Sequence, residues 1–149
     1  MQRVRRGGDQ DTRRPLTARV VQAFPRLTLL SNTIIILGMG LVVREYLDDK
    51  GQSPFRNWLA DLDLVVRARI QARILRFETG NLGDHKGVGG GVWEARLAFG
   101  AGYRIYFGKS GSELVVLLVG GAKGTQSRDI KRAKAYWAKY LEETNGEAK

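Results

Sequence analysis

The sequence predicts an α+β fold with a mainly antiparallel sheet, two helices on one face of that sheet and a basic helix at the C-terminus. Three observations predict it. The expected elements follow the order β, α, α, β, β, β, α, so consecutive strands are separated from paired helices. Apolar residues recur at helical spacing over residues 66–77, and apolar and polar residues alternate over residues 92–99 and 103–109. A hydrophobic fraction of 43% in 149 residues is enough for one core.

Residue types and helix-start signals predict the first strand and the first helix. Leu41–Tyr46 is rich in residues that favour strands, and the polar segment 48–51 ends it. Ser53 followed by Pro54 is typical of an N-cap and a first helical position. We therefore expect a helix from this point to about Leu62.

A second helix is expected to follow Asp63, which can cap it. The arginines of this helix lie mostly off its apolar face, and Gly80 supplies the C-terminal stop. The apolar face is formed by residues at i, i+4, i+8 and i+11, namely Val66, Ile70, Ile74 and Phe77.

The second half of the chain is expected to hold three strands and the last helix. A glycine-rich stretch over residues 83–91 is expected to be a loop. The strands Val92–Phe99 and Tyr103–Lys109 alternate, whereas Leu114–Val119 is apolar throughout and is expected to be a central strand covered on both faces. The last helix, from about Thr125 to Glu142, has an apolar face formed by Ile130, Ala133, Trp137 and Tyr140.

The charge balance is strongly positive, because 25 basic residues stand against 15 acidic ones and give a net charge of +10. Such an excess indicates a polyanionic partner, either nucleic acid, an anionic membrane or an acidic protein. The chain has no cysteine and one histidine, His85. This composition excludes disulfides, thiol nucleophiles, Cys-type zinc sites and any catalysis that needs two imidazoles. We expect no metal and no cofactor.

Residues 1–38 differ in character from the rest of the chain. They hold seven arginines and two aspartates, a net charge of +5, and no sustained helical or strand period appears before about Leu27. We expect Met39 to be the authentic start. Residues 1–38 would then be a poorly ordered or mis-assigned N-terminal extension, and residues 39–149 a single domain.

A signal peptide or membrane segment is the alternative for this part of the chain, since basic residues precede the apolar run Leu27–Val43. The run is interrupted by polar residues and glycines, no A-x-A cleavage pattern follows it, and it is shorter than the ~20 apolar residues that span a bilayer. We therefore expect a cytoplasmic protein with no membrane partner.

The hairpin between the second and third strands gathers charged residues on one face. Residues that lie opposite each other in a sheet share a face. Pairing Phe99 with Tyr103 places the large apolar residues of both strands together and leaves a Gly-Ala-Gly loop. Arg96 is then expected opposite Tyr106 and diagonal to Arg104. The other face of this hairpin is expected to carry Glu94, Arg96, Arg104 and Tyr106.

Two arginines this close repel each other unless a negative group lies between them. A bound phosphate would turn this repulsion into binding. The alternative is that Glu94 pairs with one arginine and that the charges are ordinary surface charges. Tyr106, on the polar face, would be available to stack on a base.

A buried strand leads directly into a basic cluster. Gly120 and Gly121 allow the end of Leu114–Val119 to turn tightly and to deliver Lys123 to the rim of the sheet. We expect the surrounding basic patch to bind RNA, although the last helix could instead be merely solvated. His85 lies on the loop before the second strand and could close the patch. The remaining basic residues of the patch are Lys86, Arg128, Lys131, Arg132 and Lys134.

Three stretches of the chain resemble the RelE/ParE toxin superfamily, and most of all its phage-derived, HigB-like branch of addiction module killer proteins. They are REYLDDKGQSPFRNWLADLD, GVWEARLAFGAGYRIYFGKSG and ELVVLLVGGAKGTQSRDIKRAKAYW. The resemblance covers about Leu41 to Leu141 and implies the RelE/ParE-like β-α-α-β-β-β-α fold. It also implies a toxin of a type II toxin–antitoxin system, neutralised by a cognate antitoxin that is usually of the helix-turn-helix type.

The resemblance implies which residues act. RelE-like members cleave mRNA in the ribosomal A site, and ParE-like members inhibit DNA gyrase. Arg96, Arg104 and Lys123 match basic positions of the RelE-type active surface. Glu94 stands where RelE carries a second lysine, which leaves the general base open.

Our hypothesis from the sequence is therefore a metal-independent, ribosome-dependent mRNA endoribonuclease that inhibits translation. The 2′-hydroxyl of RNA would attack the adjacent phosphate while Arg96, Arg104 and Lys123 clamp it and stabilise the developing charge. The candidate proton carriers are Glu94, His85 and Tyr106. The alternatives are a toxin that inhibits DNA gyrase without catalysis and a plain nucleic-acid-binding module.

Overall fold

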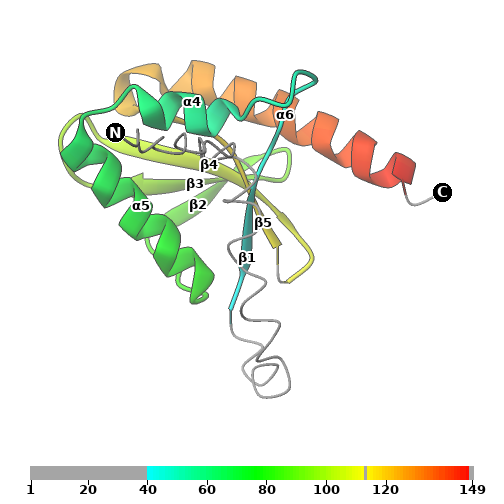
Figure 1. Cartoon of the computed structure of the whole chain (residues 1–149), viewed down its shortest axis with the longest axis horizontal. Helices are drawn as coiled ribbons and strands as arrows, with labels where there is room; N and C mark the ends of the chain where they lie inside the picture. Colours follow the sequence, from blue (N-terminus) through cyan, green and yellow to red (C-terminus); the bar gives the residue numbers. More distant parts are fainter. Residues whose placement is uncertain (1–39, 113, 148–149) are drawn as a thin grey trace, which may run out of the picture.

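A mixed five-stranded sheet with the order β1-β5-β4-β3-β2 lies at the centre of the computed structural model (Figure 1). The structure describes residues 40–112 and 114–147, so the predicted extension over residues 1–38 lies outside the described residues. β1 pairs with β5 in parallel, and the other pairs are antiparallel. The strands are β1 Val42–Glu45, β2 His85–Gly89, β3 Val92–Leu97, β4 Tyr103–Ser110 and β5 Leu114–Ala122.

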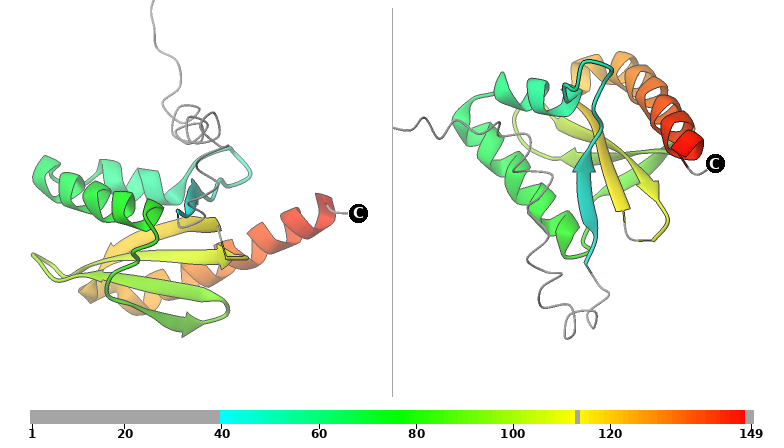
Figure 2. Two further views of the ribbon diagram at one scale, coloured as in Figure 1. Left: turned by 90° about the horizontal axis from the view of Figure 1, so that it is seen from below. Right: turned by 45° about the vertical axis from the view of Figure 1, so that its right-hand side comes forward.

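Helices cover both faces of this sheet (Figure 2). α4 (Pro54–Ala60) and α5 (Leu64–Glu78) lie on one face. A short 3-10 turn, η2 (Lys123–Thr125), leads from β5 into α6 (Gln126–Glu147), which crosses the other face. The predicted α+β class and the C-terminal helix are therefore confirmed, and the sheet is mixed because β1 runs parallel to its neighbour.

Each face of the sheet has its own core. The face under α4 and α5 buries a large cluster built around Phe55, Ile70, Phe77, Ile105 and Phe107. The face under α6 buries a second cluster that includes Tyr46, Val92, Tyr106, Leu118 and Trp137. β5 contributes to both clusters, as predicted for a central strand covered on both faces.

α4 begins at the residues that the sequence predicts. The Ser53 hydroxyl accepts a hydrogen bond from the Arg56 backbone N–H at 3.0 Å and donates one to Glu45 Oε1 at 2.9 Å. Glu45 also pairs with the Arg56 guanidinium at 2.9 Å. This cap therefore ties the helix to the end of β1. Asp63 precedes α5 as predicted, but its side chain makes no capping hydrogen bond.

Two details of the predicted sheet are wrong. The glycine-rich stretch is not entirely a loop, because His85–Gly89 forms the edge strand β2. The hairpin register is also shifted by two residues, since Leu97 lies opposite Tyr103. The connection is longer than predicted because Gly100 and Gly102 adopt φ angles of 55° and 71°, which allow a wider turn.

No helix in the described part of the chain is both long enough and apolar enough to cross a bilayer.

Candidate functional site

Arg96 and Arg104 lie directly opposite each other on β3 and β4. The even-numbered residues of these two strands share the face that α6 covers, so the predicted face is correct although the predicted partner of Arg96 is not. Arg104 is 8% exposed, whereas the side chain of Arg96 is 41% exposed. One guanidinium of the pair is therefore buried and the other is open to solvent.

Glu94 lies between the two arginines. Its carboxylate Oε1 is 3.4 Å from Arg96 Nε and 3.5 Å from Arg104 Nε. The residue is completely buried, and a buried carboxylate needs such compensation. Glu94 therefore pairs with both arginines, and not with a single one as in the alternative drawn from the sequence. One negative charge faces two positive ones, so the cluster keeps a net charge of +1.

Gln126 completes the surroundings of this carboxylate. Its side-chain amide Nε2 donates a hydrogen bond of 2.9 Å to Glu94 Oε2. Gln126 is the first residue of α6, so the carboxylate also fixes the start of that helix over the sheet. Gln126 was not predicted from the sequence, because no local pattern in the chain connects it with a strand 32 residues earlier.

Tyr106 lies opposite Glu94 on β4 and is completely buried under α6. The prediction that it can stack on a base is wrong, because Val92, Leu118 and Trp137 belong to the same core. Burial raises the pKa of Tyr106, and the negative charge of Glu94 raises this pKa further. The phenol therefore stays protonated at neutral pH. Its hydroxyl makes no hydrogen bond to a described residue.

Lys123 follows β5 and lies beside Arg104. The Lys123 backbone N–H donates to Ala101 O at 3.3 Å, across the β3–β4 loop. A Cβ atom built on Gly102 would lie 3.3 Å from Lys123 Cβ and 3.6 Å from Arg104 Nη1. The two side chains therefore flank the same glycine, and Arg104 Nη1 also donates to Gly102 O at 2.9 Å. Lys123 itself is exposed.

Lys86 extends the same face at its outer edge, because it lies opposite Glu94 on β2 and is exposed. Lys134 on α6 lies over the β2–β3 turn, since a Cβ on Gly89 would be 3.1 Å from Lys134 Nζ. Lys131 is exposed on α6, three residues before Lys134 and three after Arg128. We call the surface formed by Lys86, Arg96, Arg104, Lys123 and Lys134 the basic face.

Arg128 and Arg132 belong to a different flank of α6. They lie 3.8 and 3.9 Å from the carboxylate of buried Asp129, and Arg132 Nη2 contacts the Tyr136 hydroxyl at 3.2 Å. The five basic residues predicted to bind RNA therefore do not share one surface. Lys86 and Lys134 belong to the basic face, Arg128 and Arg132 line a surface shared with α4, and Lys131 is exposed on α6 between these two pairs.

His85 lies on the opposite face of the sheet from the arginines. It is the first residue of β2, and it is paired with Ala95, which faces α5. Its ring lies 5.6 Å from the Trp93 ring, and Nδ1 is 2.7 Å from Gly83 O. The structure therefore does not bring the histidine together with Arg96 and Arg104.

The arrangement can bind an anion on the basic face. Three cationic groups from β3, β4 and the end of β5 converge there, and one of them is fixed by burial. None of the three candidate proton carriers is placed to take a proton from a ligand on this surface: Glu94 and Tyr106 are buried, and His85 faces α5. Among residues 40–112 and 114–147, no group of three His, Cys, Asp or Glu side chains could hold a metal ion.

Comparison with curated proteins finds an uncharacterized protein of Haemophilus influenzae that is 48% identical over 81 residues. The matched residues make up 54% of this chain and 82% of that protein. No family model matches the chain, and no solved structure matches it.

Proposed function

The chain belongs to the same family as the Haemophilus influenzae protein, and we propose that it is a type II toxin of the RelE/ParE superfamily that cleaves mRNA on the ribosome. The proposal combines the sequence resemblance with the geometry of the basic face. A cognate antitoxin, of the helix-turn-helix type, would neutralise it in the cell.

One observation carries the catalytic part of the proposal: two arginines from neighbouring strands share a single buried carboxylate. Glu94 compensates one positive charge and leaves the second one uncompensated. Arg96 is the more exposed of the two, so the remaining positive potential faces solvent. A phosphodiester is a suitable ligand because guanidinium groups match its geometry and charge.

RNA supplies its own nucleophile, so the protein does not need to provide one. The 2′-oxygen attacks the adjacent phosphorus, the bond to the 5′-oxygen breaks, and a 2′,3′-cyclic phosphate remains. The 2′-hydroxyl loses a proton and the leaving 5′-oxygen gains one. Arg96, Arg104 and Lys123 bind the phosphate oxygens and stabilise the charge that develops on them.

The positions of the candidate proton carriers support dependence on the ribosome. Glu94 and Tyr106 act from below the surface: the carboxylate orients both guanidinium groups, and the protonated phenol fills the space beside it. No strong general base is left on the basic face, so the isolated protein is expected to be slow. A ribosome that holds the mRNA in a reactive conformation would supply what this surface lacks.

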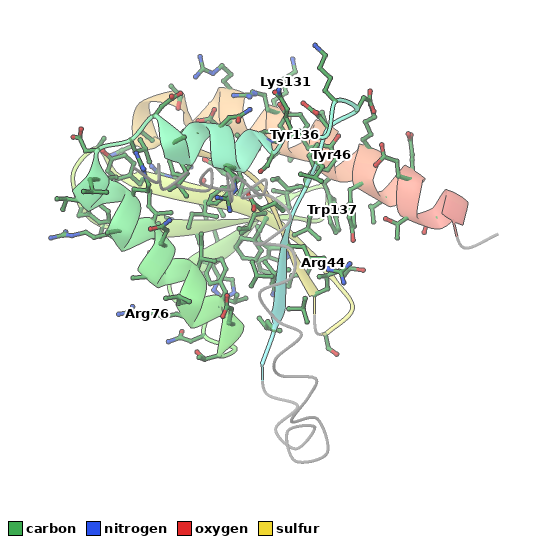
Figure 3. The ribbon with its side chains drawn as sticks, in the orientation of Figure 1. Arg44, Tyr46, Arg76, Lys131, Tyr136 and Trp137 are labelled. Atoms are coloured by element: carbon green, nitrogen blue, oxygen red, sulfur yellow. The ribbon has the colours of Figure 1, made fainter. Side chains whose placement is uncertain are left out.

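Cleavage of ribosome-bound mRNA by the full purified chain tests the proposal. We expect cuts at defined positions, and a loss of about 10²-fold in rate for Arg104→Ala, the typical effect of removing one donor to a developing oxyanion. Arg76→Ala is the matched control, because Arg76 is an exposed arginine on α5, in the layer opposite α6 (Figure 3). Thermal unfolding of both variants separates lost chemistry from lost folding.

Two results would replace this proposal by its alternatives. Inhibited supercoiling by DNA gyrase with intact mRNA would indicate a gyrase-binding toxin. Salt-sensitive binding of nucleic acid without either effect would indicate a plain binding module.

A further inference from the structure

Among residues 40–112 and 114–147, no strand pairs with the second half of β5 on the side of β1. β1 pairs only with Leu114–Leu117, and a final ladder bond joins Tyr46 N–H to Leu117 O at 2.8 Å. β5 continues to Ala122, and no strand of residues 40–112 lies against this continuation on the side of β1. The pairing with β4 shifts its register between Tyr106 and Phe107. Such a bulge bends the strand and increases its local twist.

A groove with a volume of about 470 Å³ follows this open edge. Val119–Ala122 forms its floor, with walls from α4 and from the first turns of α6. Gly120 and Gly121 present only main-chain atoms to it. A Cβ on Gly120 would overlap the Trp58 ring, and a Cβ on Gly121 would overlap the Asp129 carboxylate. The two glycines therefore allow both helices to approach β5 closely.

An open strand edge favours main-chain pairing. In an antiparallel pair, alternate residues direct their N–H and C=O groups away from the partner strand. Val119–Ala122 line the groove, and Val119 and both glycines are buried. The Ala122 carbonyl already accepts a hydrogen bond from the Thr125 hydroxyl at 3.3 Å, so an added strand would pair with Val119, Gly120 and Gly121. Sheltered backbone groups of this kind are costly to leave without hydrogen bonds. An added strand would satisfy them.

The two walls of the groove carry opposite charges. Asp48 and Asp61 lie on the side of α4. Arg128 and Arg132 lie on the side of α6 together with the buried carboxylate of Asp129, which pairs with both, so this wall keeps one net positive charge. The side chain of Arg128 is 69% exposed, so it is available to a ligand. Tyr136 also lines the groove, and its ring stacks on the Tyr46 ring with the centroids 5.2 Å apart (Figure 3).

We propose that this groove binds an extended segment of a partner protein, which adds to the sheet beside Val119–Ala122. Successive side chains of a strand point to opposite faces of its sheet. The bound segment would therefore direct every second side chain toward α6 and the others toward α4. The charges of the walls favour acidic residues on the α6 side and basic or polar residues on the α4 side. This inference does not depend on the proposed ribonuclease activity.

Selection of peptides on the full chain tests the inference. The probe is a phage-displayed library of random octapeptides, followed by synthesis of the enriched sequences. We expect enrichment of sequences in which acidic residues alternate with basic or polar ones. Their binding should slow amide hydrogen exchange at Val119–Ala122, measured by NMR, because new hydrogen bonds cover these groups.

Charge reversal at one wall provides a matched control. Arg128→Glu should weaken binding of the enriched peptides by about tenfold or more, the size of one charge-assisted contact. Lys131→Glu makes the same change of net charge on the same helix, outside the groove, and should weaken binding less. The inference fails if no peptide is enriched, if bound peptides leave exchange at Val119–Ala122 unchanged, or if Lys131→Glu has an equal effect.

Discussion

At the scale of residues, Glu94 organises the basic face. Its carboxylate lies within 3.5 Å of a guanidinium nitrogen from each of two strands and accepts a hydrogen bond from Gln126. Two arginines placed directly opposite each other are normally unfavourable. The buried carboxylate offsets this repulsion and fixes the directions of both side chains. Its contribution to binding is therefore indirect, through Arg96 and Arg104.

Neutralising this carboxylate should destabilise the protein. Glu94→Gln keeps the shape of the side chain but leaves two arginines without their shared negative partner. We expect the free energy of unfolding to fall by about 3 kcal/mol, as for other broken buried ion pairs. Urea denaturation measures this value. The same change at exposed Glu142 should cost less than about 0.5 kcal/mol, and an equal loss at both positions would contradict the account.

Tyr106 should make the stability of the protein sensitive to alkaline pH. Burial and then the charge of Glu94 raise the pKa of Tyr106, so the folded protein keeps this proton when the unfolded chain has lost it. Stability from this group is complete below about pH 10 and declines above it, by up to about 1.4 kcal/mol per pH unit. Denaturation at several alkaline pH values should show a weaker decline for Tyr106→Phe. An unchanged decline would contradict the burial of this phenol.

At the scale of elements, α6 determines which residues of the sheet are accessible. It covers the face that carries Glu94 and Tyr106, which the alternation of the strands alone would leave open. The strand β5 meets α4 on one side at Gly120 and α6 on the other at Gly121. The path of both helices therefore depends on two consecutive glycines.

A methyl group at Gly120 should separate α4 from the sheet. Gly120→Ala would overlap the Trp58 ring, and overpacking of this kind typically costs about 1–3 kcal/mol of unfolding free energy. Gly124→Ala is the control, because a Cβ there meets nothing within 4 Å. Thermal denaturation should show a lower midpoint for the first variant alone. Equal midpoints would mean that α4 does not pack closely on β5.

Alternation along the strands predicted the shared face of Arg96 and Arg104, because side-chain direction in a strand depends only on parity. The hairpin register could not be predicted in the same way. Pairing Tyr103 with Leu97 or with Phe99 leaves every residue on the same face of the sheet, so the alternation fits both registers. The edge strand β2 was missed because its glycines lack side-chain patterning. The burial of Tyr106 was not predicted, because the residue pattern of a strand does not show where a helix that begins 20 residues later in the chain will pack.

At the scale of the whole molecule, the chain has a net charge of +10, and several cations of the described residues gather on one side. Lys86, Lys123 and Lys131 are exposed on or beside the face that holds Arg96. Positive charge concentrated on one side attracts a polyanion and favours one orientation of the bound strand. Among the other cations of the described residues, Arg76 lies on α5, on the opposite side of the sheet from α6 (Figure 3).

The affinity for RNA should therefore fall as the salt concentration rises, and individual lysines should determine how steeply it falls. Each phosphate contact with a single strand contributes about 0.7 to the slope of log affinity against log salt concentration. Lys123→Ala should reduce this slope by about one contact, whereas Lys50→Ala, an exposed lysine in the loop before α4, should leave it unchanged. Fluorescence anisotropy with 2′-O-methyl RNA measures both slopes. Equal slopes for the two variants would place the RNA elsewhere.

The most direct measurement is a double-mutant cycle on the rate of cleavage of ribosome-bound mRNA, with Arg96→Ala, Arg104→Ala and the variant that combines them. If both guanidinium groups hold one phosphodiester, each single change slows cleavage by about 10²-fold. The combined change is then much less severe than the product of the two, because the residues act as a unit. Full multiplication of the two effects, or cleavage at the unaltered rate after either change, would contradict the account.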